Sequence, residues 1–152
     1  MSLTIVFDST CLIGFERIGH LDLLPKLYGE IVVPIAVVAE FGRQLSWMKV
    51  EPLSSPHLCN ALRLTLGKGE AEAIALAVQM DGQLVTDDKQ ARSVAEAMGL
   101  RVVGTLGILV RAKRAGIIEL VAPFIGELER NSFRISRALR EEALILAGEE
   151  EQ

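Results

Sequence analysis

Cysteine and histidine are scarce in this chain of 152 residues: each occurs twice, as Cys11, Cys59, His20 and His57. The four residues do not pair at the spacing of zinc ligands, so a zinc site is not expected. A disulfide between the two cysteines is equally unexpected in a reducing compartment. We therefore predict that both cysteines are small, buried hydrophobic side chains.

Long hydrophobic runs are also missing. The longest one, residues 31–39, contains Pro34 and is far shorter than the roughly 20 residues that a spanning helix needs. The first residues do not show the charged region and cleavage site of a secretory signal. We expect a cytoplasmic protein with no membrane segment. Mean hydropathy is +0.34, which argues against disorder.

Aromatic residues are few, with one Trp, one Tyr and five Phe, which argues against a long base-stacking platform. The net charge of −4 would also argue against a nucleic-acid partner if it were evenly spread. Residues 89–140 are instead net positive, whereas residues 1–88 and 141–152 are net negative. The basic segment could contact phosphates and the acidic part could hold cations, although the basic residues could also only solvate helix surfaces.

Short apolar runs alternate with helical stretches, which predicts an α/β fold with a parallel sheet. The predicted strands are 3–7, 30–33, 50–53, 83–86 and 101–103. The predicted helices are 12–19, 21–28, 34–44, 58–66, 70–80, 89–98, 105–114, 120–130 and 136–147. We expect a single domain over residues 1–147, followed by a frayed acidic tail over residues 148–152.

Acidic residues follow two of the predicted strands. Asp8 comes directly after the first strand, and Asp87 and Asp88 come after the fourth. Glu40 lies late in the predicted helix 34–44, and Glu70 opens the helix 70–80. Open parallel sheets bind ligands beyond the carboxyl ends of their strands. Carboxylates that converge there would repel one another unless a cation neutralised them, and Mg²⁺ or Mn²⁺ suits oxygen ligands.

Each of these carboxylates also has a simpler explanation. The three aspartates could only cap the helices that follow them, and Glu40 could face solvent. Glu70 and Glu72 could only complement the dipole of a first helical turn. Since these two glutamates are two residues apart, only one of them can point into a site. We favour Glu70, because the residues four and seven positions after it are apolar.

As a set, the acidic motifs resemble the successive signatures of PIN domains. The matching segments are Val6-Phe7-Asp8-Ser9-Thr10, Val33-Pro34 followed by Glu40, Gly69-Glu70-Ala71-Glu72-Ala73-Ile74, and Leu84-Val85-Thr86-Asp87-Asp88. Later segments are similar to an uncharacterised prokaryotic PIN subfamily related to the VapC toxins, namely Gly104-Thr105-Leu106-Gly107-Ile108-Leu109, Ala112-Lys113, Gly116-Ile117-Ile118 and Phe133-Arg134-Ile135-Ser136.

The resemblance implies a three-layer α/β/α fold around a central parallel sheet of about five strands. It also implies Mg²⁺- or Mn²⁺-dependent hydrolysis of RNA phosphodiesters, with Asp8, Glu40 and one of Asp87 or Asp88 as catalytic and metal-binding positions. At the third motif many PIN proteins have an aspartate, where this chain has Glu70. The resemblance further implies a VapC-like toxin that forms a homodimer and is bound by an antitoxin protein.

The main alternative is a non-catalytic nucleic-acid-binding or protein-binding module on the same scaffold, since a glutamate replaces the commoner aspartate. A receiver domain would need an early acidic pair, which this chain lacks. A dinucleotide-binding enzyme would need a glycine-rich turn after the first strand, which is also missing. Ser9 and Thr10 could bond a carboxylate or cap the next helix, while Lys89 and Arg92 could bind phosphate.

Overall fold

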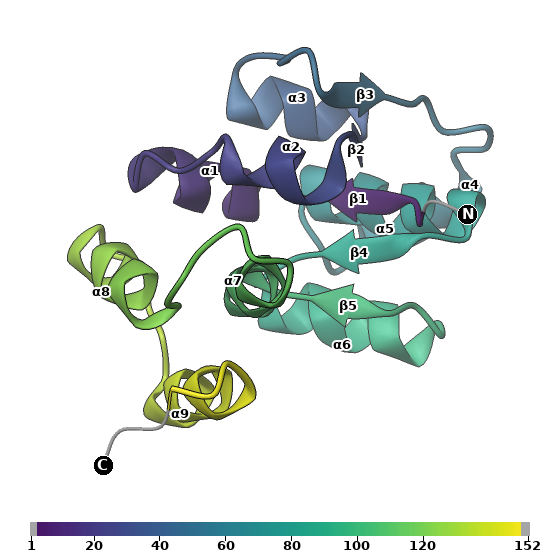
Figure 1. The fold of residues 1–152 in the computed structure, drawn as a ribbon. Coiled ribbons are helices and arrows are strands. Elements are labelled where there is room, and N and C mark those ends of the chain that lie inside the picture. Colours follow the sequence, from purple (N-terminus) through teal and green to yellow (C-terminus); the bar gives the residue numbers. More distant parts are fainter. Residues whose placement is uncertain (1–2, 150–152) are drawn as a thin grey trace.

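The computed structural model describes residues 3–149. Its centre is a sheet of five parallel strands in the order β3-β2-β1-β4-β5 (Figure 1). The strands are β1 (Ile5–Phe7), β2 (Ile31–Val33), β3 (Met48–Val50), β4 (Gln83–Val85) and β5 (Val102–Val103). In the middle strand, Val6 lies opposite Val32 on one side and Leu84 on the other. The sheet confirms the predicted α/β class and its five parallel strands.

Helices cover both faces of the sheet, so that the domain has three layers (Figure 1). The helices of the described chain are α1 (Ser9–Arg17), α2 (Leu23–Tyr28), α3 (Ile35–Phe41), α4 (His57–Leu62), α5 (Lys68–Met80), α6 (Lys89–Ala97), α7 (Thr105–Arg114), α8 (Ala122–Arg130) and α9 (Arg137–Leu146). Helices α1, α2 and α7 pack on one face and α4, α5 and α6 on the other. Helices α8 and α9 lie outside α1 and α7 (Figure 1).

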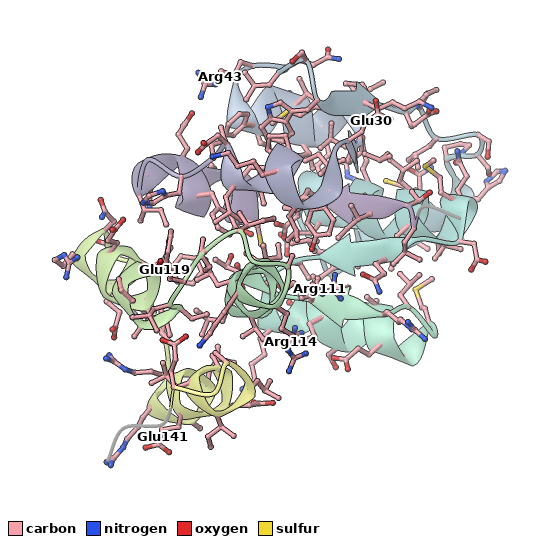
Figure 2. All side chains as sticks on the ribbon, in the orientation of Figure 1. Glu30, Arg43, Arg111, Arg114, Glu119 and Glu141 are labelled. Carbon is pink, nitrogen blue, oxygen red and sulfur yellow. The ribbon has the colours of Figure 1, made fainter. Side chains whose placement is uncertain are left out.

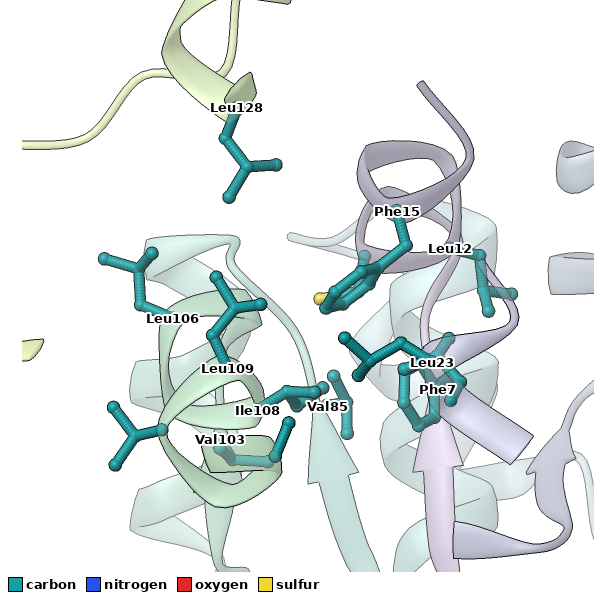
Figure 3. Close-up of a cluster of buried hydrophobic side chains, with 14 of the residues drawn as sticks. Phe7, Leu12, Phe15, Leu23, Val85, Val103, Leu106, Ile108, Leu109 and Leu128 are labelled. Atoms are coloured by element: carbon teal, nitrogen blue, oxygen red, sulfur yellow. The ribbon is translucent and has the colours of Figure 1, made fainter. Parts of the chain in front are cut away.

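The two strands β1 and β2 are apolar at every position because both of their faces are buried. Ile5 and Phe7 point into the core shared with α1, α2 and α7, whereas Val6 points into the core shared with α5. Figure 3 shows the first of these cores, to which Phe7 of β1, Phe15 of α1 and Leu109 of α7 all contribute. Continuous apolar runs of this kind are typical of parallel sheets covered on both sides.

Two helix boundaries differ from prediction for local reasons. Helix α1 begins at Ser9, three residues earlier than expected, because the Asp8 side chain caps its first turn. Helix α3 ends at Phe41 instead of residue 44, because Gly42 adopts a left-handed conformation with φ 94°.

The largest differences lie between β2 and α5. Strand β3 was predicted over 50–53 and is found at Met48–Val50; Pro52 follows it and has no N–H with which to extend the pairing. Helix α4 ends at Leu62 instead of residue 66, since the amides of Leu64 and Thr65 bond carbonyls three residues back and form a turn.

The end of the described chain is held by Glu149. Its carboxylate accepts hydrogen bonds from the amides of Val121 (2.7 Å) and Ala122 (3.0 Å) at the start of α8, and it pairs with Lys113 Nζ at 3.0 Å. Burial alone would raise the pKa of Glu149, but these donors hold it below its usual value. Residues 150–152 of the predicted acidic tail lie outside the described residues.

Both cysteines are buried and free, as predicted. Within residues 3–149, none of the helices combines the length and apolarity needed to cross a bilayer.

Candidate active site at the carboxyl edge of the sheet

Asp8 lies at the carboxyl end of the central strand and is only 1% exposed. Its Oδ1 accepts hydrogen bonds from Thr10 Oγ1 at 2.8 Å and from the Cys11 amide at 3.3 Å, and its Oδ2 accepts one from Thr86 Oγ1. Burial raises the pKa of Asp8 to about 6 in spite of these donors, and the negative charge of Asp87 adds to the rise. The ionised carboxylate is therefore well oriented but costly without a cation nearby.

Glu70 and Asp88 form a second pair of carboxyl groups in the same neighbourhood. Glu70 lies in the first turn of α5, and Asp88 caps α6 by accepting the Ala91 amide at 2.7 Å. Burial raises the pKa of Glu70 to about 7, with further contributions from the charge of Asp88 and from the hydrogen bond that the two side chains share. Asp8 and Glu40 raise it further through their charges. Glu70 therefore retains its proton close to neutral pH.

Glu40 reaches the site from the last turn of α3. Its Oε1 accepts a hydrogen bond from Ser9 Oγ at 2.9 Å. A Cβ atom on Gly69 would lie only 2.0 Å from the same oxygen. A Cβ on Gly67 would similarly lie 2.8 Å from Oε1 of Glu70. A side chain at either glycine would displace a carboxylate from its position in the site.

Two other acidic side chains turn away to neighbouring elements. Asp87 Oδ1 accepts the Thr105 amide at 2.9 Å, and Oδ2 accepts Thr105 Oγ1 at 2.5 Å and Cys11 Sγ at 3.0 Å. It thereby joins the end of β4 to the first turn of α7 and to α1. Glu72 Oε1 accepts the Ala36 amide at 3.1 Å in the first turn of α3.

The structure thus brings Asp8, Glu40 and Glu70 together with Asp88. Asp87 lies close enough to Asp8 for its charge to raise the pKa of Asp8, but its own hydrogen bonds come from Thr105 and Cys11. Sequence reasoning did not single out the buried Thr86 and Thr105, whose hydroxyls orient aspartates. The only available signal was their position at a strand end and at a helix start, which many threonines share.

The oxygen atoms gathered at this edge are those that a divalent cation prefers as ligands. Carboxylate and hydroxyl oxygens suit a hard ion such as Mg²⁺ or Mn²⁺. Within residues 3–149, no three His, Cys, Asp or Glu side chains already stand in a ligating arrangement, because Glu70 bonds Asp88 and the Asp8 oxygens bond hydroxyls. A cation would take the place of the proton between Glu70 and Asp88 and would offset both the burial and the repulsion that raise the pKa values of Asp8 and Glu70. The residues therefore fit such an ion once these side chains turn toward it.

An open parallel sheet with carboxylates gathered at its carboxyl edge defines an α/β domain that binds its ligands at this edge. A comparison with protein families matches residues 4–149 to the PIN domain. The chain belongs to the PIN domain family, whose members are generally nucleases that use divalent metals. A search of curated proteins found no match.

Proposed function

We propose that the protein is a Mg²⁺- or Mn²⁺-dependent endoribonuclease that hydrolyses phosphodiester bonds of single-stranded or structured RNA. The observation that carries this proposal is the convergence of Asp8, Glu40, Glu70 and Asp88 at the carboxyl edge of the sheet. The raised pKa values of Asp8 and Glu70 support it, because burial and neighbouring negative charges both disfavour the ionised carboxylates, and a cation would offset both effects.

Each carboxylate has a distinct role in the proposed site. Asp8 is the central ligand, since it stands on a rigid strand end and is held by hydroxyl groups. Glu70 and Asp88 complete the ligand set after they lose their shared proton. Glu40, which Ser9 orients, binds the ion or one of its waters. Asp87 acts as an anchor for α7 and not as a direct ligand.

A bound divalent ion would lower the pKa of a water molecule and neutralise charge on the phosphoryl oxygens. The protein itself supplies the orientation of the ligands and the positive charge for the RNA backbone. Lys89 and Arg92 lie on α6 just after Asp88, and neither forms an ion pair among the described residues. We assign both to phosphate binding.

The similarity of the later segments to a VapC-related subfamily supports a further proposal on the biological role. The protein would act in the cytoplasm as the toxin of a toxin–antitoxin system, as a homodimer that an antitoxin protein silences. This part rests on the motif resemblance alone.

One observation favours a second candidate, a non-catalytic binding module on the same scaffold. Among residues 3–149 no ready ligating group of three side chains exists, and a glutamate occupies the third acidic position. Such a module would bind RNA or protein without cleaving it.

The decisive experiment incubates a mixed panel of single-stranded RNAs with the protein, with and without Mn²⁺. Asp8→Asn and Asp88→Asn should each reduce cleavage by about 100-fold or more. Asp81→Asn is the matched control, because Asp81 is exposed at the end of α5 and has φ 51°, a conformation that Asn tolerates. RNA binding without cleavage under any metal would reject the nuclease and support the binding module.

A further inference from the structure

A cleft of about 170 Å³ lies between α7 and α9, beside the edge strand β5. Its walls are mainly apolar, with Leu106 and Val110 from α7 and Leu139 from α9. A cavity of roughly 150 Å³ lined by aliphatic side chains accommodates one benzene ring. The cleft is also partly open to solvent, so it has room for one ring of a planar base whose remaining atoms lie in the opening.

One end of the cleft reaches the proposed catalytic edge of the sheet. Gly104, the residue before α7, lines the cleft, and a Cβ on it would lie 2.6 Å from Asp87 Oδ1 and 3.7 Å from a terminal guanidinium nitrogen of Arg92. Asp87 and Arg92 also line the cleft, and Asp87 directly precedes Asp88 of the carboxylate cluster. An RNA strand whose scissile phosphate lies at the cluster would thus have a neighbouring nucleotide at the cleft.

Two charged side chains that line the cleft, Arg92 and Glu142, suit the phosphate and the base of a nucleotide. Arg92 forms no ion pair among the described residues and can contact a phosphate or stack on a base. Glu142 also has no hydrogen-bond or ion-pair partner within the described chain, and it lines the same cleft. A carboxylate only accepts hydrogen bonds, so it selects base edges that donate.

We propose that this cleft is a nucleotide subsite of the RNA substrate, in which a base carrying an exocyclic amino group enters between α7 and α9 and donates to Glu142. The proposal rests on the proposed nuclease function. Guanine fits best, because its N1–H and N2 amino group donate side by side to both oxygens of one carboxylate. Uracil fits worst, because it has no amino group. The apolar walls take the faces of the base, as in other pockets that read an unstacked base.

The test measures binding of fluorescent RNA pentamers, UUXUU with X as G, A, C or U, by anisotropy. Ca²⁺ replaces Mg²⁺, and gels verify that the RNA stays intact. The wild-type protein should bind UUGUU at least about fivefold more tightly than UUUUU, and Glu142→Gln should remove most of that preference. Leu139→Phe, which narrows the cleft at a partly exposed position, should weaken binding of UUGUU and leave that of UUUUU nearly unchanged.

Glu141→Gln is the matched control, because it removes the same charge from the same helix. Glu141 lies on the side of α9 away from α7 (Figure 2) and pairs with Arg137. Any general gain in RNA affinity from the lost negative charge should appear in both variants, whereas the base preference should change only in Glu142→Gln.

The outcomes separate the subsite from the nuclease. The protein could show a base preference that depends on Glu142 and yet cleave no RNA with any metal. That result would support the subsite and reject the nuclease. Cleavage without any base preference, or a preference equal in Glu142→Gln and Glu141→Gln, would overturn the subsite. Failure of the wild-type protein to bind any of the pentamers would overturn it too.

Discussion

Binding of Mn²⁺ should release protons, and the number released should depend on pH. Asp8 has a pKa of about 6 and Glu70 one of about 7 in the metal-free protein. A cation binds the deprotonated carboxylates, so both groups must lose their protons when it enters. At pH 6, Asp8 is about half protonated and Glu70 is about nine-tenths protonated, which gives about 1.4 protons per ion. At pH 8 the count should fall to about 0.1.

Protonation of Asp8 and Glu70 also makes the apparent affinity for Mn²⁺ depend on pH. Between pH 8 and pH 5.5, competition with protons weakens Mn²⁺ binding about fourfold through Asp8 and about 30-fold through Glu70, or roughly 100-fold together. Titration calorimetry in buffers that differ in their heats of protonation counts the protons directly and reports the affinity at each pH.

Two variants sharpen the measurement. Glu70→Gln should remove most of one released proton at pH 6, while Asp81→Asn on the exposed end of the same helix should change nothing. A proton count near zero at pH 6, together with an affinity that does not vary with pH, would refute the reasoning that the cation replaces the shared proton.

Three further results are expected. Because the pKa of Asp8 is higher in the folded protein (about 6) than its model value of 3.8, stability that is present below pH 4 is lost as the pH rises through 6. Asp8→Asn should therefore stabilise the metal-free protein at pH 8 by up to about 3 kcal/mol and have little effect at pH 4, and a lower melting temperature at pH 8 would contradict this. Gly69→Ala should displace Glu40 and weaken Mn²⁺ binding about tenfold in calorimetry with the fold retained by circular dichroism; unchanged affinity would show that Glu40 does not contribute. Glu149→Gln should lower the free energy of unfolding in urea by about 1–2 kcal/mol, because two amides and Lys113 lose a charged acceptor. The control Glu141→Gln should change it by no more than about 0.5 kcal/mol. Equal losses in both variants would exclude a special role for Glu149.

Much of the sheet could be predicted because its strands are buried on both faces. The strand that ends in Phe7 and the one that ends in Val33 contain only apolar side chains, and an acidic residue directly follows the first. Strand β3 was harder to place, since it is an edge strand in which Lys49 is exposed and only Met48 is buried. Its position depends on pairing with β2, which no local pattern records.

The sequence predicts which acidic residues lie near the candidate site, but it does not predict which of their side chains point into it. Asp87 and Asp88 both follow β4, and adjacent side chains on extended backbone point to opposite sides. Which of them faces Glu70 depends on the hydrogen bonds that Thr105 and Ala91 offer, and these donors come from two different helices. The side on which a glutamate of α5 lies depends likewise on the packing of α5 against α3.

The capping bond of Asp8 links the proposed metal centre to the backbone of α1. The Cys11 amide donates to Oδ1 of Asp8 at 3.3 Å, and the Ala91 amide donates in the same way to Asp88 at 2.7 Å. A carboxylate that turns toward a cation lengthens or breaks such a bond, so the exchange of that amide with deuterium becomes faster. The exchange rates of the Cys11 and Ala91 amides should therefore report whether the cation is bound. This measurement needs neither RNA nor cleavage.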